Sequence, residues 1–122
     1  MTGPAATRGG AERFGRRAEA WCRLALRLKG YRVLAARQRT PVGEIDIVAR
    51  RGGVVAIVEV KARRAGADMA EAVSPRQRAR LERAAAAYLG RHAELAGLAV
   101  RFDVMLVRPW RWPEHVCDAW RP

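Results

Sequence analysis

The sequence has few cysteines and no long hydrophobic run. Cys22 and Cys117 lie far apart and form no Cys-x-x-Cys pair, which argues against a zinc signature or a secreted disulfide framework. No apolar run approaches the roughly 20 residues that a membrane-spanning helix needs. The N-terminal stretch up to Arg17 lacks the apolar core of a signal peptide. We therefore expect a cytoplasmic protein with reduced thiols.

Acidic residues are scarce beside basic ones. The 24 Lys and Arg against 12 Asp and Glu give a formal net charge of +12. Only Lys29 and Lys61 are lysines. A small domain this basic usually meets a polyanion, and nucleic acid is the leading candidate. We expect no membrane partner, because the apolar helix faces described next are better explained by a protein core.

The chain of 122 residues suits one domain with its own core. Residues 1–10 are rich in Gly, Ala and Thr and predict a flexible tail, so the domain is expected over 11–122. Apolar residues recur at helical spacing over 11–29 and predict a first helix. Its expected inward stripe is Phe14, Ala18, Trp21, Ala25 and Leu28.

Strands are predicted over 31–40, 44–50 and 54–63, with Gly52 and Gly53 forming a tight hairpin turn between the last two. A loop is expected over 64–73. Ser74, Pro75 and Gln77 then predict a helix start with a capping box, and that helix should stop near Gly90. A strand over 98–107 and a short final strand follow. This order predicts an α/β fold with a mixed central sheet and helices packed on it.

The hairpin carries charges inside its strands. Counting back from the glycine turn places Asp46 opposite Glu59 and Glu44 opposite Lys61. Like charges directly opposed across strands are destabilising, and Mg²⁺ or Mn²⁺ bound by carboxylates would relieve the repulsion. Lys61 projects to the same face as Glu59. The alternative is a solvated edge of salt bridges, and the spacing alone does not decide between the two.

These residues resemble the PD-(D/E)xK signature of restriction-endonuclease-like nucleases, with Asp46 followed by the segment Glu59-Val60-Lys61. Five blocks are similar, in order, to those of the YraN-like family of bacterial proteins: GRRAEAWCRLALRLKGYRVLAAR, GEIDIVAR, VEVKAR, EAVSPRQRARL and RFDVMLV. The resemblance implies a restriction-endonuclease-like αβββαβ core, similar to that of archaeal Holliday-junction resolvases. It further implies a metal-dependent endonuclease acting on branched DNA, and a homodimer, because a junction is two-fold symmetric.

In that resemblance Asp46 and Glu59 hold Mg²⁺ or Mn²⁺, Glu19 from the first helix assists as a further ligand, and Lys61 helps to activate water. From the residues alone, Glu19 could equally pair with a nearby Arg. Glu44 is a supplementary ligand or a partner that holds Lys61.

The second predicted helix carries a candidate DNA-binding face. Arg76, Arg80 and Arg83 share one side of it, where they would contact phosphates, and Gln77 would support the site. The alternative is a solvated charged face. Asp103 is expected to pair with an Arg across the sheet, and the tryptophans near the C-terminus to cover the core. Two other functions stay open: a non-catalytic nucleic-acid-binding protein on a nuclease scaffold, and a factor whose basic surface binds an acidic protein.

Overall fold

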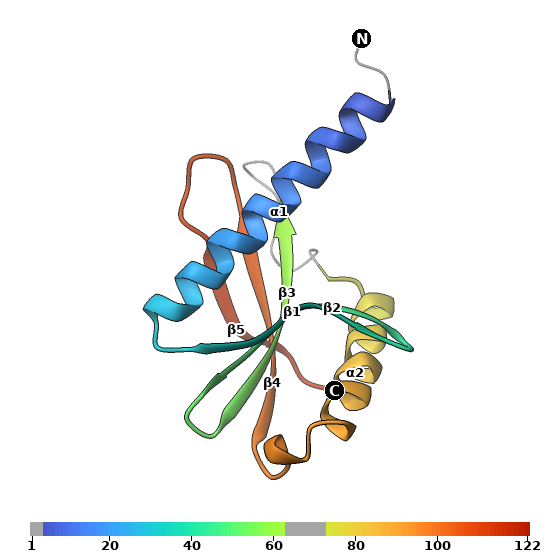
Figure 1. Ribbon diagram of the computed structural model, residues 1–122, viewed down its shortest axis with the longest axis vertical. Helices are drawn as coiled ribbons and strands as arrows, with labels where there is room; N and C mark the ends of the chain where they lie inside the picture. The colour runs from blue at the N-terminus through green and yellow to red at the C-terminus, as the bar shows by residue number, and fades with distance from the viewer. Residues whose placement is uncertain (1–3, 63–72) are drawn as a thin grey trace.

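The computed structural model describes the backbone of residues 4–62 and 73–122 and the side chains of residues 15–62 and 73–122. The elements follow the predicted order, and the predicted α/β fold with a mixed sheet is confirmed (Figure 1). They are α1 (Pro4–Leu28), β1 (Arg32–Thr40), β2 (Gly43–Arg51), β3 (Val54–Ala62), α2 (Pro75–Gly90), the short 3-10 helix η2 (Ala93–Leu95), β4 (Ala99–Val107) and β5 (Glu114–Trp120). Of the loop predicted over 64–73, only Val73 falls within the described residues.

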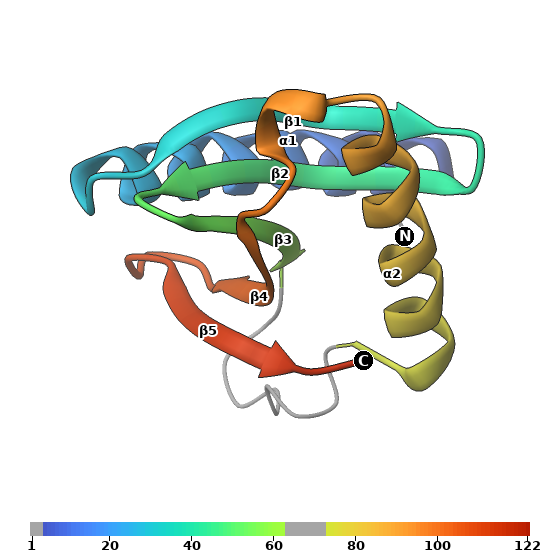
Figure 2. The ribbon, with the colours of Figure 1, turned by 90° about the horizontal axis from the view of Figure 1, so that it is seen from below.

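The five strands form one sheet in the order β1-β2-β3-β4-β5. Figure 2 shows them in this order, from β1 at the top to β5 at the bottom. Strands β3 and β4 are parallel, and the other neighbouring pairs are antiparallel. Parallel neighbours need a crossover connection, and the segment that contains α2 supplies it. The sheet is therefore mixed because one helix separates two hairpins.

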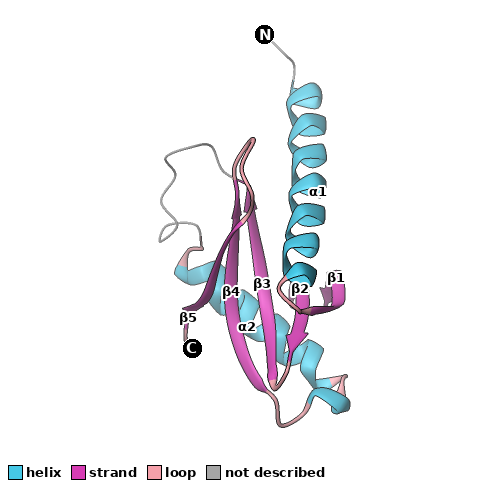
Figure 3. Ribbon diagram, turned by 90° about the vertical axis from the view of Figure 1, so that its left-hand side faces the viewer, coloured by secondary structure: helices cyan, strands magenta, loops and turns pink. Residues whose placement is uncertain are grey.

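The two helices cover opposite faces of the sheet. Strand residues alternate between the faces, so Val55 and Ile57 of β3 pack with α2 while Ala56 and Val58 pack with α1. Figure 3 shows α2 passing behind the strands, with α1 beside them. The inward side of α2 is Leu81, Ala84, Ala85 and Tyr88, as its spacing predicts.

Helix α1 differs from its prediction in length and in the face that it buries. It begins at Pro4 rather than at residue 11, so residues 4–10, expected as a tail, are helical; proline is well suited to a first helical turn. Of the predicted stripe, Ala18 and Ala25 are buried, whereas Trp21 is 50% and Leu28 71% exposed. Phe14 lies outside the described side chains.

The buried face of α1 is a row of mostly small residues, Ala18, Cys22, Ala25 and Leu26. The apolar stripe predicted from helical spacing is therefore rotated relative to the face of α1 that is buried. Small side chains let a helix lie close to a sheet, and large ones are displaced to the flanks. No helix among the described residues is long and apolar enough to cross a membrane.

The β2–β3 hairpin turns as predicted and then opens. Arg51 pairs with Val54, and Gly52 has φ +59°, a left-handed conformation that glycine tolerates. The predicted register is confirmed as far as the pair Ile47 and Val58, where the ladder ends. Beyond it the strands diverge, with β3 rising and the β1–β2 ribbon bending to the right in Figure 1.

Strand β2 changes faces at this point. Ile45 packs with the α2 cluster, whereas Ile47, two residues later, packs with the α1 cluster. Residues two apart in a regular strand share a face, so the alternation breaks at Asp46. In β1, Ala36 pairs with Ile47 and Gln38 with Ile45. Arg37, between them, has φ +51°. The irregularity therefore spans both strands beside Asp46.

Candidate active site

Asp46 lies in the gap where β2 leaves β3. Its Oδ2 accepts a hydrogen bond from the backbone N–H of Val60, at 2.8 Å. A buried N–H without a partner is costly, and the carboxylate supplies a partner beyond the end of the β2–β3 ladder. Where β2 and β3 diverge, the Asp46 side chain thus takes the place of a backbone hydrogen bond between the two strands.

Glu59 provides the second carboxyl group of the site. The pKa of Asp46 is raised to about 8 by burial, by a hydrogen bond with the Glu59 side chain and by its charge, while the Val60 N–H and Lys61 act in the opposite direction. Two close acids in a partly buried site do not readily ionise together. The pair therefore keeps a proton to a higher pH than an isolated carboxyl group would.

Lys61 completes a compact cluster with Glu59. Its Nζ lies 3.5 Å from Glu59 Oε2, and both side chains are 14% exposed. Glu59 and Lys61 alternate with the residues that pack on α1, so they project toward the α2 side of the sheet. The sequence count through the hairpin turn placed Asp46 and Glu59 correctly beside each other.

The expected pairing of Glu44 with Lys61 is wrong. Glu44 instead faces Arg39 of β1, with Arg39 Nε 3.8 Å from Glu44 Oε2, and both side chains are substantially exposed. The physical reason is the divergence of β2 and β3, which ends their register before residue 44. Glu44 lies at the rim of the site and outside the cluster of Asp46, Glu59 and Lys61.

Glu19 comes to the site from α1 and is held by an arginine. Arg37 Nε–H donates to Glu19 Oε1 at 2.6 Å. Glu19 and Arg37 line a surface cavity of about 450 Å³. The pKa of the buried Cys22 thiol is raised to about 12 by burial and by the charges of Asp46 and Glu19, which indicates that both carboxyl groups lie near this thiol.

Glu19 does not join Asp46 and Glu59 in a tight ligand set. Among the described residues, one group of three His, Cys, Asp or Glu side chains has ligand atoms that all lie within 4.8 Å of one another. That group does not include Glu19, Asp46 or Glu59. The interpretation of Glu19 as a partner of an arginine describes the observed contact. No sequence pattern indicates Arg37 as that partner, because the contact depends on the positive φ of Arg37 and on the placement of α1.

The face of α2 that carries Arg76, Arg80 and Arg83 is exposed. The aliphatic part of Arg80 crosses the start of β2, where a Cβ added to Gly43 would lie 3.3 Å from its Cγ and Cδ atoms. Arg80 therefore lies at the N-terminal end of β2, the strand that carries Asp46. Gln77 has another role, because its side chain accepts from the Ser74 N–H and completes the predicted capping box.

A second cluster links β4 and β5. The ligand atoms of Asp103, His115 and Cys117 all lie within 4.8 Å of one another, close enough to hold a metal ion. His115 Nε2 is 2.8 Å from Asp103 Oδ2 and 3.5 Å from Cys117 Sγ. Sequence reasoning missed this group, because its members are brought together by the β4–β5 pairing and by no recognisable spacing.

The same cluster is already rich in hydrogen bonds. Fully buried Asp103 accepts two bonds from Arg101, both of 2.8 Å, and one from the Asp118 N–H, while Lys29 Nζ lies 3.1 Å from His115 Nδ1. Burial raises the pKa of Asp103, but the hydrogen bonds from His115, Arg101 and Asp118 outweigh it and lower the pKa to about 2. The partner of Asp103 is indeed an arginine, although it lies two residues away on the same strand rather than across the sheet.

These features define a mixed α/β protein with a partly buried pair of acids and a lysine where two strands part. The sequence matches the model of Uncharacterised protein family UPF0102 over residues 18–107. The chain belongs to this family, which confirms the YraN-like resemblance drawn from its motifs. The matched region contains Glu19, Asp46, Glu59 and Lys61.

Relatives match along nearly the whole chain. A UPF0102 protein of Parvibaculum lavamentivorans is 61% identical over 112 residues, which cover 92% of this chain and 84% of the relative. One from Paramagnetospirillum magneticum is 52% identical, covering 91% and 89% of the two chains. One from Mesorhizobium japonicum is 50% identical, covering 95% and 93%. The chain is therefore similar in extent to these proteins.

Proposed function

We propose that the protein is a cytoplasmic, Mg²⁺- or Mn²⁺-dependent endonuclease that hydrolyses phosphodiester bonds in structured or branched DNA. The observation that carries the proposal is the contact of Asp46 with Glu59, beside Lys61, in a chain of net charge +12. The sequence resemblance to PD-(D/E)xK nucleases supports the same assignment.

The donor set fits a hard divalent cation. Asp46 and Glu59 offer carboxylate oxygens, the ligands that Mg²⁺ and Mn²⁺ prefer. Burial and the neighbouring Glu59 raise the pKa of Asp46, and a bound cation would favour the ionised form of both carboxyl groups. The Val60 N–H fixes the orientation of the Asp46 carboxylate. Glu19 would extend the ligand set after release from Arg37.

Each residue would then have a distinct role. A bound cation would polarise the scissile phosphate and lower the pKa of a coordinated water. Asp46 and Glu59 would position the phosphate against that water. The Lys61 ammonium would orient the water and offset the negative charge that develops as the phosphate is attacked. Its ion pair with Glu59 already fixes the direction of the lysine.

The basic surface would supply the affinity for DNA. Arg76, Arg80 and Arg83 would contact phosphates, which gives affinity without sequence preference. A homodimer would bring two such sites to a two-fold symmetric junction.

Cleavage of labelled linear, nicked, flapped and four-way DNA with Mn²⁺ or Mg²⁺ tests the proposal. We expect the native protein to cut at least one branched form, and Asp46→Asn or Glu59→Gln to abolish the cutting while leaving the circular dichroism spectrum unchanged. Glu94→Gln is the matched control, because Glu94 is exposed on η2 at the opposite end of β4. Cutting that survives in both variants would exclude this site.

One observation favours a second function. Arg37 forms an ion pair with Glu19, and the carboxyl group of Glu19 does not form a tight ligand set with those of Asp46 and Glu59. This arrangement is expected of a scaffold that binds nucleic acid without cutting it. This function predicts salt-sensitive binding that is equal in the native protein and in Asp46→Asn, with no cleavage by either on any of the substrates.

A further inference from the structure

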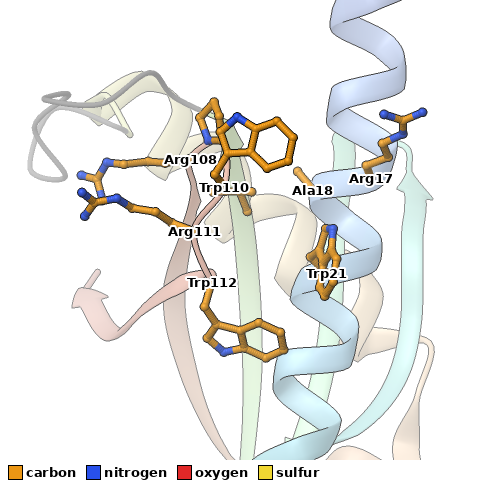
Figure 4. A pocket seen from close by; sticks show the side chains of 9 residues that line it. Arg17, Ala18, Trp21, Arg108, Trp110, Arg111 and Trp112 are labelled. Atoms are coloured by element: carbon orange, nitrogen blue, oxygen red, sulfur yellow. The ribbon is translucent and has the colours of Figure 1, made fainter.

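A pocket lined by three tryptophans lies outside the acidic site. The pocket, of about 550 Å³, opens between α1 and the loop that joins β4 to β5. Its aromatic lining is Trp21, Trp110 and Trp112, shown in Figure 4. Of the C-terminal tryptophans expected to cover the core, only Trp120 does so; Trp110 is fully exposed and Trp112 is 51% exposed.

Two of the three tryptophans of the pocket contact each other. Trp21 and Trp112 form an edge-to-face pair with ring centroids 5.7 Å apart, an arrangement that favours fixed ring orientations. Trp110 has φ +63°, a backbone conformation that bulky residues rarely adopt and that carries an energetic cost. The loop thus keeps a strained backbone while one indole stays open to solvent.

The charge around the pocket is positive. The three charged residues that line it are Arg17, Arg108 and Arg111. Arg108 forms an ion pair with Glu114 at 3.0 Å. Figure 4 shows Arg108 and Arg111 pointing to the outer side of the loop, away from the indoles. An apolar ligand in the pocket would therefore have cationic groups beside it, where an attached anionic chain could pass.

The pocket and the acidic site lie near the same ends of β3 and β4 but on opposite faces of the sheet, because the pocket is on the α1 side and Glu59 and Lys61 project toward the α2 side. On α1, Ala18 lines the pocket while Glu19, the next residue, lines the cavity beside Arg37. In the sheet, Lys61 pairs with Leu106 in the parallel register, and the following residue, Val107, lines the pocket. A strand of nucleic acid that occupied both sites would therefore pass around these strand ends.

We propose that this tryptophan pocket binds unpaired nucleobases of a single-stranded DNA segment adjoining the acidic site. Every base has a flat face that stacks on an aromatic ring without regard to sequence, and arginines beside the rings suit the phosphates. Bases inside a duplex are covered by their neighbours, so the pocket selects flaps, branches or gaps. The inference rests on the proposed function insofar as it describes the substrate of that acidic site.

Binding measured without cleavage separates the two proposals. The Asp46→Asn protein, in EDTA, is titrated into a fluorescently labelled 20-nucleotide single strand and into a labelled blunt duplex. We expect the added Trp110→Ala change to weaken single-strand binding at least about tenfold, as loss of one stacked base would, and to alter duplex binding little. Trp110→Phe, which keeps an aromatic ring, should restore most of the affinity.

Leu28→Ala is the matched control, because Leu28 is exposed on α1 outside the pocket lining and should leave both affinities unchanged. Equal loss of single-strand and duplex binding in Trp110→Ala, or no loss, would overturn the pocket proposal. The proposal would also be overturned if Trp110→Ala lost binding to vesicles of phosphatidylglycerol and phosphatidylcholine but kept its binding to the single strand. That result would indicate that the pocket binds a lipid surface instead.

The two proposals fail in different ways. Tryptophan-dependent binding of single strands by a native protein that cuts none of the branched substrates would support the pocket and reject the nuclease. Metal-dependent cutting that is unaffected by Trp110→Ala on flapped DNA, with unchanged binding, would reject the pocket and leave the nuclease standing.

Discussion

Arg37 and Glu19 form the shortest ion pair recorded between side chains of the described residues, with Arg37 Nε 2.6 Å from Glu19 Oε1. The pair joins β1 to α1 beside Asp46. Arg37 reaches Glu19 from a left-handed backbone conformation, and its pKa is raised by the hydrogen bond to Glu19 and by the charges of Glu19, Glu44 and Asp46. A cation entering the site must therefore compete with a guanidinium that is already there.

Removal of this guanidinium should strengthen metal binding. Arg37→Asn frees Glu19, and asparagine tolerates the left-handed backbone better than most residues. We expect several-fold tighter Mn²⁺ binding in isothermal titration calorimetry. Arg32→Asn, on an exposed residue of the same strand, should leave the affinity unchanged. Equal affinities for native and Arg37→Asn protein would mean that Glu19 takes no part in binding the metal.

The metal-free protein should lose stability between about pH 4 and pH 8 because of Asp46. The folded pKa of about 8 lies above the ordinary value of 3.8, so the unfolded chain releases this proton first as the pH rises. The contribution of Asp46 to the free energy of unfolding is full below pH 3.8 and is lost as the pH rises through about 8. Asp46→Asn, whose amide oxygen can still accept from Val60, should unfold at a higher temperature than the native protein at pH 8.

Differential scanning calorimetry in EDTA at pH 5 and pH 8 checks this prediction. The gap between native and Asp46→Asn melting temperatures should widen at pH 8, and added Mn²⁺ should narrow it by stabilising the native protein alone. A gap that does not change with pH would show that the two acids do not repel each other in the folded state.

Local features of the chain made the acidic pair predictable. Asp46 and Glu59 are separated by one tight turn, so their register follows from a count through Gly52 and Gly53. Features that depend on packing between distant elements were not predictable in this way. The Arg37–Glu19 contact needs a backbone irregularity in β1, and the exposure of Trp110 needs a positive φ in a loop; neither has a sequence pattern of its own.

The Asp103 network should make the protein sensitive to acid. The folded pKa of Asp103 is about 2, below the ordinary 3.8, so its contribution is full above about pH 4 and is lost as the pH falls through 2. Asp103→Asn leaves Arg101 without its charged partner, and removal of one member of a buried pair costs roughly 3–5 kcal/mol. Urea unfolding at pH 7 should show a loss of that order.

Asp118→Asn serves as the control for this experiment. Asp118 is exposed, has φ +55° and gives its backbone N–H, rather than its carboxylate, to Asp103. Asparagine keeps that N–H and tolerates the backbone conformation, so the free energy of unfolding should change by less than about 1 kcal/mol. A similar loss in both variants would mean that the network does not depend on the Asp103 charge.

The arginine face of α2 should set the salt dependence of duplex binding. Replacement of Arg76, Arg80 and Arg83 by glutamine removes three phosphate contacts. The slope of log K against log salt should then become less negative by about 3, since each contact contributes about 0.9 for duplex DNA. Fluorescence anisotropy of a labelled duplex between low and moderate salt measures the slope. Loss of affinity with an unchanged slope would indicate that these residues support the fold instead of contacting phosphates.

Two clusters are candidates for the proposed metal site, and substitution can distinguish them. Asp103 already accepts hydrogen bonds from Arg101, and Lys29 contacts His115, which disfavours a cation there. Asp46 and Glu59 are two close acids that a cation would bring to the ionised form. Mn²⁺ binding, followed by electron paramagnetic resonance of the free ion, should be abolished by the double change Asp46→Asn and Glu59→Gln. It should persist in Cys117→Ser, which removes an exposed sulfur ligand without disturbing the Asp103 carboxylate. Binding lost in Cys117→Ser and retained in the double variant would place the metal between β4 and β5 and remove the acidic pair from the proposed chemistry.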